Sequence, residues 1–152
     1  MRAGGGFVHG LTFSHHPVGA AVGRAVLRRI RELGLVDAAA ARGPHLLASL
    51  GAALEGQASV GDIRGRGLLA AVELVADRKT KEPFPPGERM VERVVAAARR
   101  RGLLVYWSKG CADGVAGDVV VLGPPLIITP GEIDLAADRL ASAVAAVAAG
   151  GD

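Results

Sequence analysis

The sequence predicts an α+β fold in which helices pack on one face of a small, mostly antiparallel sheet. Segments with apolar residues at helical spacing alternate with short apolar runs bounded by glycine and proline. Their order is helix, helix, strand, strand, helix, strand, strand, helix, which favours an antiparallel sheet covered by helices on one side. The chain of 152 residues has the length of one ordinary domain.

Two helices are expected first. Proline suits the first turn of a helix, so the first helix should begin at Pro17 and end at Gly34. Its valines recur at helical spacing and its arginines lie on the other face. A second helix covers roughly residues 36–54, and Gly43-Pro44 in its middle predicts a kink or two shorter helices.

The period then changes to that of strands. Residues 60–63 and 68–75 are predicted as strands, with the sequence Arg64-Gly-Arg-Gly67 between or within them. The second strand is nearly all apolar except for Glu73, so it should be central and covered on both faces. Arg64 and Arg66 are expected to have a structural role in this glycine-flanked turn.

The remaining elements follow from the same signals. A helical apolar stripe starting at Met90 should end at Arg101 and Gly102. Residues 103–106 and 119–122 are predicted strands, 108–117 a glycine-rich loop and 126–128 an extended segment. Thr129 and Glu132 form a capping box with proline between them, which predicts the start of the last helix.

Composition restricts the function. The net charge is +3, but basic and acidic residues are interspersed, which favours solvated helix faces and argues against a nucleic-acid partner. The single cysteine, Cys111, excludes an internal disulfide and fits a reducing, cytoplasmic location. No apolar window predicts a membrane span or a signal peptide. His9, His15 and His16 lack ligand spacing, so no metal site is expected.

Five blocks of sequence, taken in order, resemble the class III (omega-type) aminotransferases, which use pyridoxal phosphate. The blocks are residues 9–14, 60–68, 73–75, 101–104 and 123–129, and the first reads His-Gly-Leu-Thr-Phe-Ser. Nearly the whole chain is similar to the C-terminal third of these fold type I enzymes. The resemblance implies that residues 1–34 are the end of the large cofactor-binding domain with its connecting helix. Residues 35–150 would then be the C-terminal small domain.

The resemblance also implies site residues. The hydroxyl of Thr12 and the backbone of Leu11 would bind the cofactor phosphate of the opposite subunit of a homodimer, for which hydroxyl and amide donors are suited. The lysine that forms the Schiff base with the cofactor would lie upstream. None of Lys79, Lys81 and Lys109 has a suitable context, so no catalytic residue is expected in this chain.

The sequence departs from the family pattern at two places. The glycine usual after Ser14 is His15, whose side chain would crowd the interface or contact substrate. The arginine that often follows the Gly-Leu-Leu-Val strand and binds a substrate carboxylate is Tyr106, followed by Trp107. Tyr106 and Trp107 are expected either to line an apolar or amine-binding pocket or to fill the core.

These observations lead to the hypothesis that the chain is the C-terminal part of a transaminase and is inactive on its own. The whole enzyme would move an amino group from an amine or amino acid to a keto acid. The alternatives are a non-catalytic small domain that binds a partner or a full-length homologue, another class III enzyme such as an aminomutase or racemase, and a basic nucleic-acid-binding domain. In the first case, residues 1–34 should expose an apolar surface.

Overall fold

The computed structural model describes residues 10 and 12–151, which form two compact units divided between Leu35 and Val36. The main element of the first unit is helix α1 (Pro17–Glu32). The ring nitrogen Nδ1 of His16 caps this helix by accepting a hydrogen bond of 3.0 Å from the amide of Gly19. Gly34 follows the helix with φ of +57°. Both predicted ends are confirmed, and no residue of α1 is buried.

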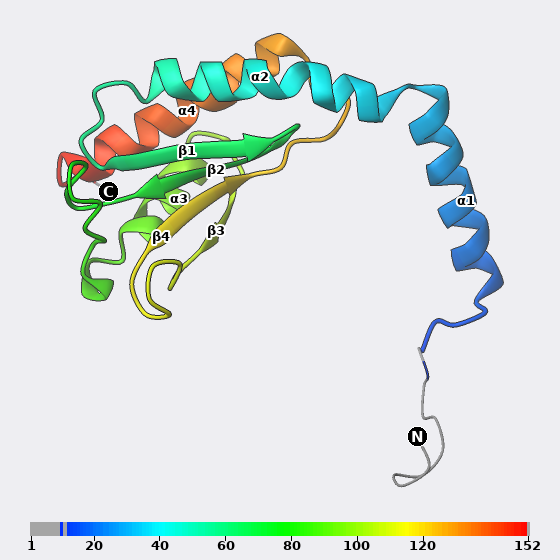
Figure 1. The fold of residues 1–152 in the computed structure, drawn as a ribbon, viewed down its shortest axis with the longest axis horizontal. Coiled ribbons are helices and arrows are strands. Elements are labelled where there is room, and N and C mark those ends of the chain that lie inside the picture. Colours follow the sequence, from blue (N-terminus) through cyan, green and yellow to red (C-terminus); the bar gives the residue numbers. More distant parts are fainter. Residues whose placement is uncertain (1–9, 11, 152) are drawn as a thin grey trace, which may run out of the picture. The chain divides into compact units, whose positions relative to one another are not determined.

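The second unit contains a four-stranded antiparallel sheet with the strand order β1-β2-β4-β3 (Figure 1). Helices accompany this sheet, which confirms the predicted α+β class. The strands are β1 (Val60–Arg66), β2 (Leu69–Leu74), β3 (Tyr106–Ser108) and β4 (Asp118–Leu122). The helices are α2 (Leu35–Ala53), the short 3-10 helix η1 (Pro86–Glu88), α3 (Met90–Arg100) and α4 (Pro130–Ala148).

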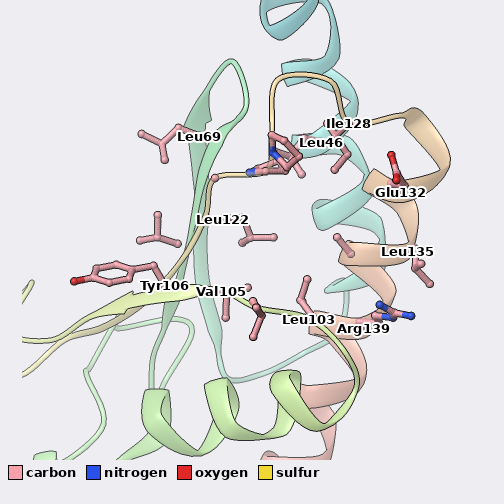
Figure 2. A pocket seen from close by; sticks show the side chains of 16 residues that line it. Leu46, Leu69, Leu103, Val105, Tyr106, Leu122, Ile128, Glu132, Leu135 and Arg139 are labelled. Atoms are coloured by element: carbon pink, nitrogen blue, oxygen red, sulfur yellow. The ribbon is translucent and has the colours of Figure 1, made fainter. Parts of the chain in front are cut away.

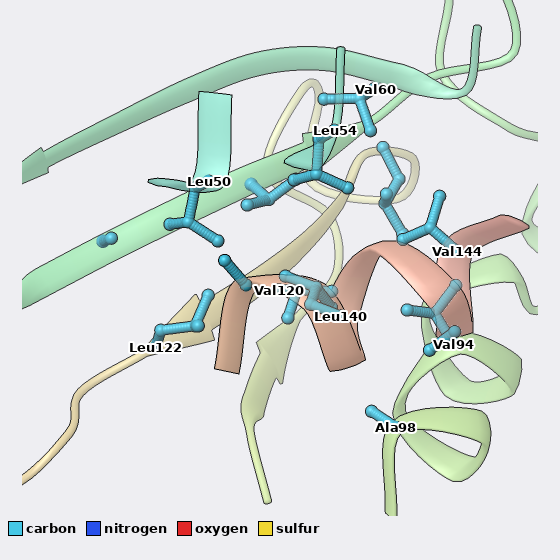
Figure 3. Packing of buried hydrophobic residues seen from close by; sticks show 14 of the residues in the cluster. Leu50, Leu54, Val60, Val94, Ala98, Val120, Leu122, Leu140 and Val144 are labelled. Carbon is cyan, nitrogen blue, oxygen red and sulfur yellow. The ribbon is translucent and has the colours of Figure 1, made fainter. Parts of the chain in front are cut away.

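The core lies between the sheet and helices α2, α3 and α4 (Figure 3). Its side chains are almost all Leu, Val and Ala, in agreement with the 3% of aromatic residues in the chain. Helix α2 contributes Leu46 and Leu50, while Val72 and Val120 come from the two central strands. The capping box of Thr129 and Glu132 is present at the start of α4, as predicted.

Strand β2 is central, but the prediction that both its faces are covered is wrong. Ala70, Val72 and Leu74 are buried, and they alternate with residues that are exposed or half-buried. Leu69 is 60% exposed. The run looked uniformly apolar because leucine and alanine also occupy the open face, where one side of an antiparallel sheet can be solvated.

Three predicted boundaries are also wrong. Residues 103–105 precede the β3–β4 ladder, which starts at the pair Tyr106–Val121. Residues 126–127 form a turn rather than an extended segment, because the amide of Ile128 donates to the carbonyl of Pro125 at 2.9 Å. Strand β1 extends to Arg66, so Arg64 and Arg66 belong to the strand and not to the turn.

Helix α2 is one helix that contains Pro44, so the alternative of two shorter helices is wrong. The reason for the preceding glycine is steric. A Cβ atom at Gly43 would lie 2.7 Å from the Cα atom of Gly67, which forms the β1–β2 turn with φ of +56°. Two glycines therefore allow the helix to lie directly against the turn.

Candidate functional site

The turn over residues 12–15 carries two of the predicted site residues. Thr12 and His15 are both exposed, and Leu11 lies outside the described residues. His15 has φ of +59°, a left-handed conformation that favours glycine. This geometry explains why glycine is usual at this position of the family motif, and it presents the imidazole of His15 to solvent.

Tyr106 and Trp107 lie on opposite faces of the sheet. Tyr106 stands opposite Val121 and is 76% exposed, whereas Trp107 stands opposite the fully buried Val120. Successive side chains of a strand point to opposite faces. The structure therefore directs these two side chains away from each other, and places Tyr106 on the open face of the sheet.

A largely apolar cavity of about 650 Å³ lies where strands β3 and β4 approach the start of helix α4 (Figure 2). Tyr106 is at its outer end and points away from Leu135 and Arg139, and Trp107 does not line it. We call this cavity the β3–α4 groove, after the residues that line it. They include Leu46, Leu103, Val105, Leu122, Ile128 and Leu135.

Two of the three lysines donate hydrogen bonds within the fold, and the third is exposed. The Nζ atom of Lys81 donates to the carbonyl of Gly61, and that of Lys109 lies 2.8 Å from Oε1 of Glu92. Lys79 is exposed in a turn where its amide donates to Asp77.

A buried carboxylate that the sequence did not reveal connects strand β4 to helix α3. Oδ2 of Asp118 accepts a hydrogen bond of 3.2 Å from the amide of Val91, and therefore caps α3 from a distant part of the chain. Burial raises the pKa of Asp118. The only signal in the sequence is an acid directly before an apolar strand, which is too common to identify a cap.

Glu92 lies beside this cap. Burial is the largest single influence on the pKa of Glu92 and raises it, but the hydrogen bond from Lys109, a backbone hydrogen bond and the charges of Lys109 and Arg89 together lower the net pKa. The ion pair therefore holds Lys109, near the start of the glycine-rich loop, against helix α3. It also provides a structural role for Lys109, to which the sequence assigned none.

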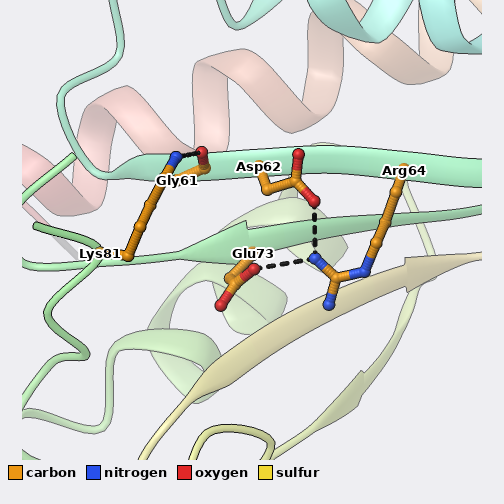
Figure 4. Close-up of polar contacts among 5 residues, drawn as sticks. All are labelled: Gly61, Asp62, Arg64, Glu73 and Lys81. Carbon is orange, nitrogen blue, oxygen red and sulfur yellow. Dashed lines mark hydrogen bonds and ion pairs between the residues drawn. The ribbon is translucent and has the colours of Figure 1, made fainter. Parts of the chain in front are cut away.

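Arg64 joins two strands on the open face of the sheet (Figure 4). Its guanidinium lies 2.8 Å from carboxylate oxygens of both Asp62 on β1 and Glu73 on β2. The hydrogen bond from Arg64 lowers the pKa of Asp62. The expected structural role of Arg64 is supported, although its partners are carboxylates and it lies within a strand.

Among the described residues, those that suit the cofactor implied by the resemblance are suited to its phosphate end alone. The exposed hydroxyl of Thr12 is a suitable donor to a phosphate. Within the described part of the chain, no group of three His, Cys, Asp or Glu residues could hold a metal ion. No helix there is long and apolar enough to cross a membrane.

Comparisons with known proteins identify the family of this chain. The sequence profile of the family "Aminotransferase class-III" matches residues 1–144. The aminotransferase YodT of Bacillus subtilis is 37% identical over 148 residues, which are 97% of this chain and 33% of that protein. The adenosylmethionine-8-amino-7-oxononanoate aminotransferase of Geobacter sulfurreducens is 39% identical over 95% of this chain and 30% of its own length.

Solved structures show the same relation. A transaminase from the marine bacterium Virgibacillus superposes with a TM-score of 0.84 at 31% identity, over 94% of this chain and 31% of that one. An (S)-enantioselective omega-transaminase from Thermomicrobium roseum gives 0.79 at 37% identity, over 95% and 30%. The chain thus spans about a third of the length of the curated relatives it matches, and it belongs to the class III aminotransferases.

Proposed function

We propose that this chain is the C-terminal part of a pyridoxal-phosphate-dependent transaminase and is inactive on its own. The complete homodimeric enzyme moves an amino group from an amine or amino acid to a keto acid. One observation carries the proposal: the family match runs through nearly the whole chain, yet the chain spans only about a third of its relatives. The environments of the three lysines support it further.

The residues present indicate which roles belong to the cofactor, to this chain and to the rest of the enzyme. When bound, the cofactor supplies the electron sink for the amino transfer. This chain supplies the Thr12 hydroxyl as a donor to the cofactor phosphate in the site of the opposite subunit, and the backbone of Leu11, which lies outside the described residues, is the second proposed donor. The Schiff-base lysine belongs to a part of the enzyme that this sequence does not span.

Tyr106 and His15 are the proposed substrate contacts. Tyr106 is exposed on the open sheet face and offers a phenol where many relatives offer an arginine. A phenol cannot bind a carboxylate through two charged N–H donors as a guanidinium does. The proposal therefore favours amine substrates over donors held by their carboxylate at this position.

A chimera tests the proposal. This chain would replace the matching 30% of the Thermomicrobium roseum omega-transaminase, and an (S)-configured amine with a keto acid would be supplied. We expect turnover by the chimera and none by the isolated chain. Turnover by the isolated chain would contradict the proposal, as would a chimera that folds and retains cofactor but transfers no amino group.

The phosphate contact has its own test in the same chimera. We expect Thr12→Val to raise the Kd for pyridoxal phosphate about tenfold, which corresponds to about 1.4 kcal/mol. Thr12→Ser keeps the hydroxyl and should restore the affinity. Equal affinities for all three proteins would remove Thr12 from the site.

A further inference from the structure

Strand β3 carries Tyr106 but has few contacts of its own to hold it in place. It has three residues, it is an edge of the sheet, and its ladder with β4 runs only from the pair Tyr106–Val121 to the pair Ser108–Val119 (Figure 1). A segment with so few backbone pairs belongs to the least stable parts of a fold. The position of Tyr106 therefore depends on contacts at the two ends of β3.

The entry to β3 is attached to the end of helix α3 and to helix α4. The amide of Leu103 donates to the carbonyl of Ala98 at 2.9 Å. The guanidinium of Arg139 on α4 donates to the carbonyl of Gly102 at 3.0 Å. These bonds fix the chain just before Leu104, so the course of β3 beyond that point depends on its other end.

The exit from β3 is attached to the first turn of helix α3. Lys109 follows the strand directly, and its Nζ atom lies 2.8 Å from Oε1 of Glu92, whereas Nε of Arg89 approaches that oxygen only to 3.7 Å. The Lys109 and Glu92 side chains are 30% and 22% exposed. The other oxygen of Glu92, Oε2, is buried and has no hydrogen-bond partner among the described residues. Removing Lys109 would therefore leave a largely desolvated carboxylate without its nearest cation.

The neighbouring strand β4 does not need this ion pair. Asp118, its first residue, accepts a hydrogen bond from the amide of Val91 in the same turn of α3. Strand β4 also pairs with β2 along its whole length. The ion pair between Lys109 and Glu92 is thus a contact that holds the end of β3 in particular.

We infer that Lys109 and Glu92 are a positioning pair for Tyr106. Their ion pair fixes the end of β3, and with it the place at which the Tyr106 ring meets the amine substrate. Neither residue touches the substrate, because the pair lies at helix α3 while Tyr106 stands on the open face of the sheet. This inference rests on the proposed function, in which Tyr106 is a substrate contact.

The first test uses the isolated chain, in which Trp107 is the single tryptophan and reports directly on β3. Lys109→Met removes the ammonium group and keeps an unbranched side chain. We expect it to shift the Trp107 emission to the red and to speed hydrogen exchange across residues 106–108 by roughly tenfold. Lys109→Arg keeps the charge and should restore both properties. Unchanged exchange in Lys109→Met would overturn the inference.

Arg64→Met is the matched control for a lost cation. Arg64 lies 2.8 Å from carboxylate oxygens of both Asp62 and Glu73, but it joins β1 to β2 and does not contact β3. This variant should leave the Trp107 emission and the exchange across residues 106–108 unchanged. Equal effects of the two methionine variants would indicate a general loss of stability and would refute the positioning role.

The second test measures substrate affinity in the chimera with the Thermomicrobium roseum enzyme. The substrate is (S)-α-methylbenzylamine, and the binding probe is the matching (S)-alcohol, which has no amino group to transfer. We expect Lys109→Met to raise the KM for the amine and the Kd for the alcohol about threefold with kcat unchanged, because it weakens a contact made in ground state and transition state alike. In the Tyr106→Ala background, Lys109→Met should change neither value further. An equal rise with and without Tyr106 would show that the pair does not act through Tyr106.

The outcomes for the positioning pair and for the proposed function are distinct. A chimera that transfers the amino group, and whose KM is unchanged by Lys109→Met, refutes only the pair. A chimera that transfers no amino group, but that loses affinity for the alcohol upon Lys109→Met only when Tyr106 is present, refutes only the enzyme assignment. A chimera that does not bind the alcohol removes Tyr106 as a substrate contact and refutes the pair with it.

Discussion

Helices α1 and α4 have similar lengths, 16 and 19 residues, but α4 buries six residues and α1 buries none. The two units that contain these helices also differ in charge. Residues 1–35 contain five arginines and one glutamate, whereas residues 36–152 contain 13 basic and 14 acidic side chains. Helices of this length are marginal in water without tertiary packing. The second unit thus carries its own stabilising core, and α1 depends on a surface that the described residues do not provide.

The largest expected effect comes from removing the same side chain in each unit. Leu50 of α2 is fully buried, and Leu27 of α1 is 55% exposed. We expect Leu50→Ala to lower the free energy of unfolding of the second unit by about 2–5 kcal/mol. Leu27→Ala should change it by less than about 0.5 kcal/mol. Urea denaturation of both variants checks this, and a similar loss for the two would show that α1 is packed in solution.

A pair of helix glycines gives the next effect. Gly43 of α2 faces the β1–β2 turn, whereas a Cβ atom at Gly23 of α1 would meet nothing within 4 Å. We expect Gly43→Ala to destabilise the second unit by about 1–3 kcal/mol through overpacking. Gly23→Ala should instead raise the helicity of α1, because alanine is favoured over glycine by about 1 kcal/mol in a helix. Circular dichroism with thermal melting measures both changes.

The same contrast explains what the sequence could and could not predict. Local signals found the ends of α1 at Pro17 and Gly34 and the capping box at Thr129, because their causes lie within a few residues. The burial of only one face of β2 and the late start of β3 depend on which strands become neighbours. The cap that Asp118 provides for α3 joins residues 27 positions apart. The family motifs indicated Thr12 and Tyr106 as site candidates, but only the strand register separates Tyr106 from Trp107.

Helix caps provide a third, smaller comparison. Asp118→Ala leaves the amide of Val91 without its acceptor and should cost about 0.5–2 kcal/mol. His16→Ala removes the exposed cap of α1 and should lower only the helicity of that helix. A loss of stability in the second unit upon His16→Ala would contradict the independence of the two units.

The pH dependence of the Asp118 cap has a definite sign. Because burial raises the folded-state pKa of Asp118 above 3.8, its contribution to stability is complete below pH 3.8 and is lost as the pH rises through the folded pKa. Asp118→Asn keeps an acceptor without the charge. We therefore expect the wild-type protein to lose stability relative to this variant as the pH rises above 3.8, as measured by urea denaturation at several pH values. A flat difference would show that the carboxylate is solvated.

Surface ion pairs should give the smallest effects. Arg64→Gln removes two contacts of 2.8 Å, one to Asp62 within β1 and one across to Glu73 on β2, whereas Arg29→Gln removes one contact of 3.5 Å to Glu32 within α1. Exposed pairs contribute about 0–1 kcal/mol and weaken with salt. The pKa of Asp62 is lowered by Arg64, so the contribution of this pair is present above pH 3.8 and is lost as the pH falls through the folded pKa. Arg64→Gln should therefore flatten acid denaturation slightly in the second unit, and Arg29→Gln should leave that curve unchanged.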